Sequence, residues 1–231
     1  QEVFLNRARE CDILGDGLET TECRIWFADQ CGYMRRRRMK EAPTCQLKGY
    51  YQEKNQQTAF VALQVLYNYC DITISPEAIA DGFAQVCTLT GLRGRWEILS
   101  ESPLTICDTG HNSHGIRYVV EQLKTENGKR ETENGMLHIV FGMVADKDID
   151  VVLSILPEEA VYYFTQPATS RALPASQLLA RWQSLHPAHQ ACRCFGSVAT
   201  AITAAQKEAS NKDIIFIGGS NYVVGEVLCT K

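Results

Sequence analysis

From Leu104 onward, the chain alternates short apolar runs with longer segments whose apolar residues repeat at helical spacing. The apolar runs are expected to form buried strands, and they cover residues 105–108, 136–144, 160–165 and 213–218. The segments between them are expected to form helices, and they cover residues 112–125, 147–156, 174–184 and 197–210. Two more strands are expected at residues 189–195 and 222–229. This order predicts an α/β fold with a Rossmann-like, mostly parallel sheet covered by helices on both faces.

The first part of the chain carries fewer strand signals, so a domain border is expected near residue 97, with domains at 1–97 and 98–231. The elements expected before this border are helices at 3–10, 56–69 and 76–86, a strand at 24–28 and an irregular β region at 33–47. Residues 95–103 are expected to connect the two domains, and residues 126–135 to form a polar loop.

One strand of this pattern runs straight into a candidate site. After the apolar residues 105–107 come Asp108, a turn that contains Gly110, and His111. Ligands of open α/β sheets bind where strands end and helices begin, so Asp108 and His111 are the first candidate site residues. Two alternatives stay open. Asp108 can cap the following helix, and Asp108, His111 and His114 have the D-x-x-H-x-x-H spacing of metal ligands, although no fourth ligand is near.

Two further polar residues have side chains suited to a nucleotide. The guanidinium of Arg95 can hold phosphate oxygens in a forked pair, and the amide of Asn55 can read the edge of an adenine. Arg95 can instead form an ion pair with Glu97 or Glu101, and Asn55 can instead cap a helix.

Five segments resemble the motifs of a known family, in the same order and at similar separations. They are Gly49/Gln52/Asn55, Gly94-Arg95-Trp96-Glu97, Asp108 to Asn112, the strand at 140–145 followed by Asp146-Lys147-Asp148, and Gly219 to Glu226. They resemble the motifs of the folylpolyglutamate synthases, including the bifunctional dihydrofolate synthase form, within the Mur ligase superfamily. The departures are local: Arg93 replaces a proline, Thr109-Gly110 replaces Gly-Ala, and Ser113 replaces a proline.

The resemblance implies an ATP-dependent ligase that joins L-glutamate to folate, or to dihydropteroate, through an acyl phosphate. It implies that Asp108 contacts the ribose, Arg95 the phosphates and Asn55 the adenine, and that His111 lies near the reacting phosphate and the incoming glutamate. Lys147 and Ser220 are expected to face the substrates, although the triplet around Lys147 also suits a solvated turn. The resemblance further implies that residues 98–231 form the C-terminal ligase domain, and that residues 1–97 end a P-loop-type central ATPase domain.

The family's phosphate-binding loop, G-x-x-x-x-G-K-[ST], is not found in this sequence. Gly128-Lys129 does not fit it, because Leu123 stands at the position of the first glycine and Arg130 follows the lysine. The chain also lacks an initial methionine. It is therefore expected to be a fragment that is inactive alone, with ATP and Mg²⁺ as cofactors and the magnesium ligands mostly upstream. The alternatives are a non-catalytic module that binds a nucleotide or a partner, and a Mur ligase that acts on cell-wall precursors.

Composition and charge indicate which kinds of partner and which cellular compartment to expect. The formal net charge of −4 argues against a nucleic-acid-binding surface, and the run Arg35 to Arg38 is interpreted as a solvated strand edge. The sequence contains no apolar run of about 20 residues and no signal peptide, so a cytoplasmic monomer without membrane contact is expected. The ten cysteines form no C-x-x-C pair, which favours free thiols in a reducing compartment.

Overall fold

The computed structural model describes residues 43–70, 72–131, 135–145 and 148–229. The predictions for residues 3–10, 24–28 and 35–38, and for Lys147, lie outside the described residues, as does most of 33–47. The chain divides into two compact units, one that includes Lys54–Asp81 and one made of Cys45–Glu53 and Gly82–Lys231. The predicted border of family domains near residue 97 stays a prediction.

Three helices precede the sheet in the part of the chain that the structure describes. α2 spans Gln52–Tyr69, α3 spans Pro76–Ala84 and α4 spans Val86–Thr90. α3 begins as its sequence predicts, with Pro76 in the first turn and the Ser75 hydroxyl accepting the N–H of Ala78 at 3.1 Å. α4 ends at Gly91, whose φ of 68° is the left-handed conformation that glycine adopts without strain. No helix among the described residues is long and apolar enough to cross a membrane.

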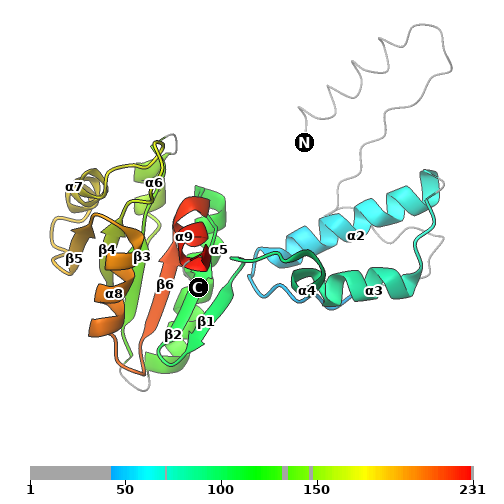
Figure 1. The fold of residues 1–231 in the computed structure, drawn as a ribbon, viewed down its shortest axis with the longest axis horizontal. Coiled ribbons are helices and arrows are strands. Elements are labelled where there is room, and N and C mark those ends of the chain that lie inside the picture. The colour runs from blue at the N-terminus through cyan, green and yellow to red at the C-terminus, as the bar shows by residue number, and fades with distance from the viewer. Residues whose placement is uncertain (1–42, 71, 132–134, 146–147, 230–231) are drawn as a thin grey trace, which may run out of the picture. The chain divides into compact units, whose positions relative to one another are not determined.

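The larger unit contains a six-stranded sheet (Figure 1). Its strands are β1 (Glu97–Glu101), β2 (Leu104–Asp108), β3 (Leu137–Phe141), β4 (Ala160–Thr165), β5 (Cys192–Phe195) and β6 (Ile214–Gly218). The spatial order is β1-β2-β6-β3-β4-β5, in which β1 is antiparallel to β2 and every other pair is parallel. The predicted α/β class and mostly parallel sheet are confirmed.

Helices cover both faces of this sheet, as expected (Figure 1). They are α5 (Ser113–Glu131), α6 (Ile149–Leu153), α7 (Ala175–Leu185), α8 (Val198–Glu208) and α9 (Asn221–Cys229). α5, α6 and α7 pack on one face, around Ile106, Ile139 and Phe216. α8 and α9 pack on the other face, around Cys107, Val140 and Ile217. Alternate residues of each central strand therefore enter opposite cores, which is why these strands are apolar throughout.

Several sequence predictions are wrong in detail. Residues 222–229 form α9 and not a strand, because the buried Val223 and Val224 cover a sheet face and the Ser220 hydroxyl accepts the N–H of Val223 at the helix start. Residues 95–103 contain the edge strand β1, which the sequence did not indicate, and their assignment as the connection between domains stays a prediction. The predicted polar loop at 126–135 begins as the last turns of α5, which continues to Glu131. A polar sequence of good helix formers can extend a helix wherever that helix leaves the core.

The turn between β6 and α9 depends on Gly219. Its φ is 95°, and an added Cβ atom would lie 2.7 Å from the carbonyl oxygen of Gly142 and 2.8 Å from Cε2 of Phe141. Replacing Gly219 by alanine is therefore expected to lower the free energy of unfolding by about 2–4 kcal/mol, through backbone strain and overpacking. Urea denaturation of the purified chain measures this change.

Gly225 provides the matched control, because it lies within α9 and an added Cβ atom meets nothing within 4 Å. Gly225→Ala is expected to raise the free energy of unfolding by up to about 1 kcal/mol, since alanine favours helices over glycine. Equal losses in the two variants would contradict the role assigned to the Gly219 turn.

His138 is a buried titratable group at the opposite end of the sheet. Its side chain lies on β3, with Nδ1 2.9 Å from the Tyr163 hydroxyl and Nε2 3.5 Å from Oδ2 of Asp213. Burial lowers the pKa of His138, although the negative charge of Asp213 acts in the opposite direction. The folded protein therefore binds a proton at His138 less readily than the unfolded chain does.

The free energy of unfolding is expected to fall as the pH decreases from about 7 to about 5, because an unfolded histidine titrates near 6.5 and the folded one titrates lower. Urea denaturation across this range checks the expectation. His138→Gln should flatten the dependence, whereas substitution of the exposed His114 by glutamine should leave it unchanged. A slope that His138→Gln does not alter would exclude His138 as its source.

Candidate functional site

The site is organised by Asp108, the last residue of β2. Its carboxylate has no exposed surface and accepts three hydrogen bonds. The Tyr51 hydroxyl and the Trp96 N–H both donate to Oδ2, at 2.8 and 2.7 Å, and the Gly110 N–H donates to Oδ1 at 2.7 Å. Burial raises the pKa of Asp108, while these donors and the charge of Arg95 act to lower it. Asp108 thus joins three separate segments of the chain.

Asp108 does not cap the helix that follows it. Asn112 has that role, because its Oδ1 accepts the N–H of Gly115 at 2.7 Å in the first turn of α5. The Asp108 carboxylate instead bonds to Gly110, ahead of the helix. The capping alternative for Asp108 is therefore wrong.

A tight turn at residues 94–97 presents Arg95. Gly94 has a φ of 72° and Trp96 a φ of 49°, and the latter is uncommon for a residue that carries a side chain. The turn is held by the N–H of Thr109, which donates to the Gly94 carbonyl at 3.0 Å, and by the Asp108 bond to the Trp96 N–H. The Trp96 side chain is only 6% exposed and packs in the core. Anchored backbone strain of this kind is typical of functional sites.

Glu97 closes the turn from its other side. Its Oε2 accepts the N–H of Gly94 at 2.7 Å, and its Oε1 forms an ion pair with Arg93. Glu97 was one of the two partners expected for Arg95, and the structure shows that it binds Arg93. The positive charge of Arg95 acts to lower the pKa of Asp108 and of Tyr51, against the effect of burial.

A pocket of about 410 Å³ lies beside this turn. It is lined by three groups of residues, at 46–48, 87–88 and 91–97. The cations in its wall are Lys48, Arg93 and Arg95, and Glu97 is the carboxylate among them. Because Arg93 is paired with Glu97, the wall keeps an excess of positive charge from Lys48 and Arg95. A pocket of this size and charge suits an anionic small molecule.

Hydrogen bonds hold the segment that carries Tyr51 against the rest of the sheet-containing unit. Gln122, a buried residue of α5, accepts the N–H of Tyr50 at 2.8 Å and donates to the Lys48 carbonyl at 3.1 Å. The Gln46 side chain accepts the N–H of Cys87 at 2.9 Å. Sequence reasoning missed Gln122 and Tyr51. An amide among the apolar residues of α5 is a signal for Gln122, because a buried amide needs partners, but no local pattern marks Tyr51.

His111 is oriented by its own turn. Its Nδ1 lies 2.9 Å from the Thr109 carbonyl oxygen, which can only accept a hydrogen bond. Nδ1 therefore carries the hydrogen, and in the neutral ring the lone pair is on Nε2. This nitrogen is suited to accept a proton from a ligand.

The other predicted site residues are placed as follows. Ser220 follows β6, the strand that pairs with β2 so that Gly218 is opposite Asp108. It therefore lies at the same edge of the sheet, but it is 2% exposed and its hydroxyl accepts the Val223 N–H at 3.2 Å. Asn55 lies in the first turn of α2, in the smaller unit, and Lys147 is outside the described residues.

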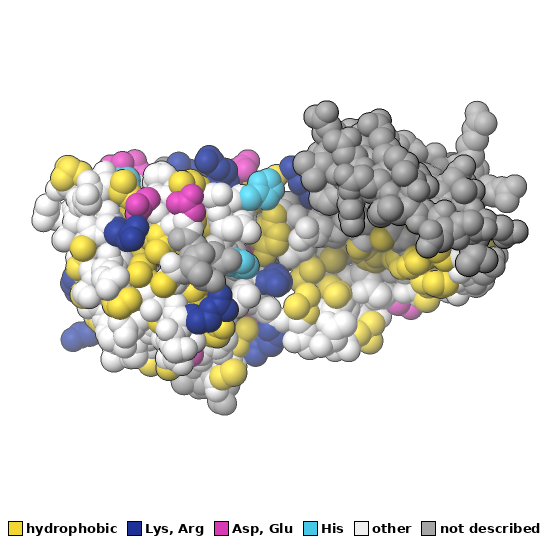
Figure 2. Space-filling view, turned by 90° about the horizontal axis from the view of Figure 1, so that it is seen from above, with side chains coloured by type: hydrophobic (Ala, Val, Ile, Leu, Met, Phe, Trp, Pro, Cys, Tyr) yellow, Lys and Arg dark blue, Asp and Glu magenta, His cyan; other side chains and the backbone are white. Residues whose placement is uncertain are grey.

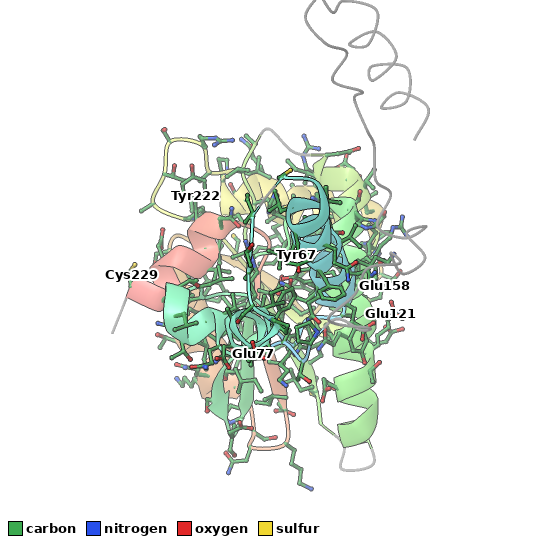
Figure 3. The ribbon with its side chains drawn as sticks, turned by 90° about the vertical axis from the view of Figure 1, so that its right-hand side faces the viewer. Tyr67, Glu77, Glu121, Glu158, Tyr222 and Cys229 are labelled. Atoms are coloured by element: carbon green, nitrogen blue, oxygen red, sulfur yellow. The ribbon has the colours of Figure 1, made fainter. Side chains whose placement is uncertain are left out.

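Arg171 and Tyr222 meet at the start of α9. Arg171 is exposed, and its Nη1 lies 3.5 Å from the Tyr222 hydroxyl. Tyr222 lies at one end of α9 and Cys229 at the other (Figure 3). In the space-filling view, basic and acidic side chains are interspersed on the surface of the sheet-containing unit (Figure 2). No three histidine, cysteine, aspartate or glutamate residues in the described part of the chain are grouped so as to hold a metal ion.

Known proteins are similar to this chain in sequence. The family model of the Mur ligase glutamate ligase domain matches residues 94–221. The chain is 32% identical, over 177 residues, to dihydrofolate synthase/folylpolyglutamate synthase of Escherichia coli, a match that covers 76% of this chain and 37% of that protein. It is 27% identical to folylpolyglutamate synthase of Lacticaseibacillus casei, over 78% of this chain and 38% of that protein.

A solved structure agrees with these matches. The bifunctional folylpolyglutamate synthase/dihydrofolate synthase of Yersinia pestis, complexed with AMPPNP and Mn ion, superposes with a TM-score of 0.63 at 29% identity. The match covers 82% of this chain and 40% of that one, so the chain spans about two fifths of the length of these relatives. The family model covers more than half of the chain and includes Arg95, Asp108 and His111. The chain therefore belongs to the Mur ligase family and carries its glutamate ligase domain.

Proposed function

We propose that this chain is part of an ATP-dependent ligase that joins L-glutamate to folate, and in a bifunctional form also to dihydropteroate. The observation that carries the proposal is the Asp108 hydrogen-bond set, which fixes the turn of Arg95 at the carboxyl edge of the sheet. The relatives in E. coli and L. casei bear the names of such enzymes. Because the chain spans about two fifths of their length, the activity is proposed for the full-length protein.

The described residues fit a nucleotide. Arg95 and Lys48 bring positive charge to the wall of the pocket, where they are assigned to phosphate oxygens. The Asp108 carboxylate is assigned to ribose hydroxyls, and Asn55 to the adenine. The Y. pestis relative was solved with AMPPNP and Mn ion, which supports ATP with a divalent cation, here assigned as Mg²⁺. The ligands of that cation are assigned mostly to other parts of the full-length protein, as the family resemblance implies.

The chemistry assigns distinct tasks to the residues of this chain. ATP supplies the phosphoryl group that converts a poorly electrophilic carboxylate into an acyl phosphate. Arg95 offsets negative charge on the transferring phosphate. His111, with its lone pair on Nε2, is assigned to take a proton from the amine of the incoming glutamate as that amine attacks. Ser220 and Lys147 are assigned to binding of the substrates. Exclusion of water protects the activated carboxylate from hydrolysis.

The setting proposed for this enzyme is a cytoplasmic monomer that acts on small molecules, without nucleic-acid or membrane partners. The interspersed charges in Figure 2 support the absence of a nucleic-acid-binding surface on that face, because such a surface would gather cations.

The 231-residue chain alone is expected to show no ligation, because the phosphate-binding loop motif is missing from its sequence. The measurement incubates the purified chain with ATP, Mg²⁺, L-glutamate and either dihydropteroate or tetrahydrofolate, and detects the glutamylated product and free phosphate. Formation of product would contradict this expectation. Nucleotide binding without ligation, both alone and in the full-length protein, would instead favour a binding module.

In the full-length enzyme, Arg95→Ala is expected to lower kcat/KM at least about tenfold, or about 1.4 kcal/mol, because a phosphate contact is lost. Asp108→Ala should have an effect at least as large, and it should also lower the thermal stability because three hydrogen-bond donors, one of them the buried N–H of Trp96, lose their acceptor. The matched control is Arg181→Ala, which removes an exposed arginine of α7 that is paired with Asp150. Near-normal kinetics for Arg95→Ala would contradict the phosphate contact and would mean that Arg95 is only a surface cation.

A further inference from the structure

The Asp108 carboxylate is almost saturated with donors. A carboxylate has about four lone-pair positions, and here Oδ2 accepts two hydrogen bonds and Oδ1 accepts one. One position remains, on Oδ1. The two neighbouring hydroxyls of a ribose need two acceptor positions to bind together. If Asp108 binds a ribose, as the proposed function requires, one of the present donors has to leave.

The two backbone donors are fixed by their surroundings. The Trp96 N–H belongs to the turn at 94–97, which is closed by the Thr109 and Glu97 hydrogen bonds to Gly94. The Gly110 N–H lies only two residues from Asp108, in the turn that leads to α5. An added Cβ atom on Gly94 would lie 2.7 Å from Cγ1 of Val224, so the turn is also packed tightly against α9. Releasing either backbone donor would require the turn itself to rearrange.

Tyr51 differs from both, because it donates through the end of a side chain. It is half-buried and lies on a segment 57 residues away from Asp108 in the sequence. The backbone of this segment is held separately by Gln122, which accepts the N–H of Tyr50 and donates to the carbonyl of Lys48. The Tyr51 hydroxyl can therefore leave Asp108 by a side-chain rotation, which gives up its side-chain hydrogen bond with Gln52 but leaves the two backbone hydrogen bonds of the segment in place.

We propose that the Tyr51 hydroxyl occupies the place of a ribose hydroxyl on Asp108, and that a bound nucleotide displaces it. This proposal rests on the proposed function, and it specifies which group hydrogen-bonds Asp108 while no nucleotide is bound. Removing a donor from a buried carboxylate costs free energy. The tyrosine therefore stabilises the protein while the site is empty. The same hydrogen bond opposes binding, because the nucleotide must replace it. Tyr51 thereby sets the affinity for the ribose hydroxyls in particular.

The test compares ATP with 2′,3′-dideoxy-ATP, which lacks both hydroxyls, in the full-length protein with wild-type Tyr51 and with Tyr51→Phe. Phenylalanine keeps the ring and removes the donor. Because a hydrogen bond to a charged group no longer has to be broken, Tyr51→Phe is expected to bind ATP about tenfold more tightly, as measured by calorimetry. The affinity for 2′,3′-dideoxy-ATP should stay within about twofold, because that ligand does not compete for the acceptor.

Tyr50→Phe is the matched control. Tyr50 is the neighbouring tyrosine, and among the described interactions only its backbone N–H is bonded, to Gln122. This variant should leave both affinities unchanged. A second readout uses wild-type protein labelled at tyrosine ¹³Cζ, in which ATP should shift the Tyr51 signal and 2′,3′-dideoxy-ATP should not. It tests the proposal even if Tyr51→Phe folds poorly.

The outcomes separate two kinds of failure. If wild-type protein prefers ATP to 2′,3′-dideoxy-ATP but Tyr51→Phe binds ATP equally or more weakly, the tyrosine is a fixed positioning group and the displacement is refuted. If neither wild-type protein nor Tyr51→Phe distinguishes ATP from 2′,3′-dideoxy-ATP, Asp108 does not take ribose hydroxyls, and the assignment of Asp108 in the proposed function fails first. A gain for ATP alone, with a matching ¹³C shift, establishes the displacement.

Discussion

Taking a carboxylate out of water costs several kcal/mol unless donors replace the water, and Asp108 satisfies this condition by drawing three segments together. The Tyr51 hydroxyl, the Trp96 N–H and the Gly110 N–H converge on it from different parts of the sequence. The conformation of the turn that carries Arg95 depends on this carboxylate. The strained φ of Trp96 persists because a buried hydrogen bond and a buried ring hold it from two sides.

The sheet supplies the rigid base for this arrangement. β2 lies between the edge strand β1 and the central strand β6, and Asp108 ends it opposite Gly218. The turns at this edge are closely packed, since added Cβ atoms at Gly142, Gly218 and Gly219 would lie within 3 Å of neighbouring atoms. Close packing leaves the backbone little freedom, so the polar groups at the edge are held in place before any ligand arrives. A site of this kind loses little entropy when its ligand binds.

The charges around the pocket divide into a structural pair and groups left for a ligand. Arg93 and Glu97 neutralise each other and close the turn, whereas Arg95 and Lys48 keep a positive character in the pocket wall. Asp108 is shielded from the pocket by burial and by its donors. The proposed ligand carries both phosphates and hydroxyls, and it would need cations and a separate acceptor of this kind. This arrangement also explains how the site stays folded without that ligand.

Fold class and most element positions follow from the sequence, because an apolar run that is buried on both faces and a helical apolar stripe are local patterns that burial preserves. The Asp108 turn was predictable for the same reason, since it joins a clear strand to a clear helix. Residues 222–229 were not, because a short apolar segment suits a strand or a helix equally, and only packing on the sheet beside α8 decides between them. Tyr51 and Gln122 could not be identified as partners of the site, because the contacts of Tyr51 with Asp108 and of Gln122 with Lys48 span 57 and 74 residues. The sequence alone determined the fold class and the residues to which the chemistry is assigned in the proposal, whereas the tertiary structure decided which donors complete the buried carboxylate, since hydrogen-bond partners of a buried group depend on what folding brings within about 3 Å.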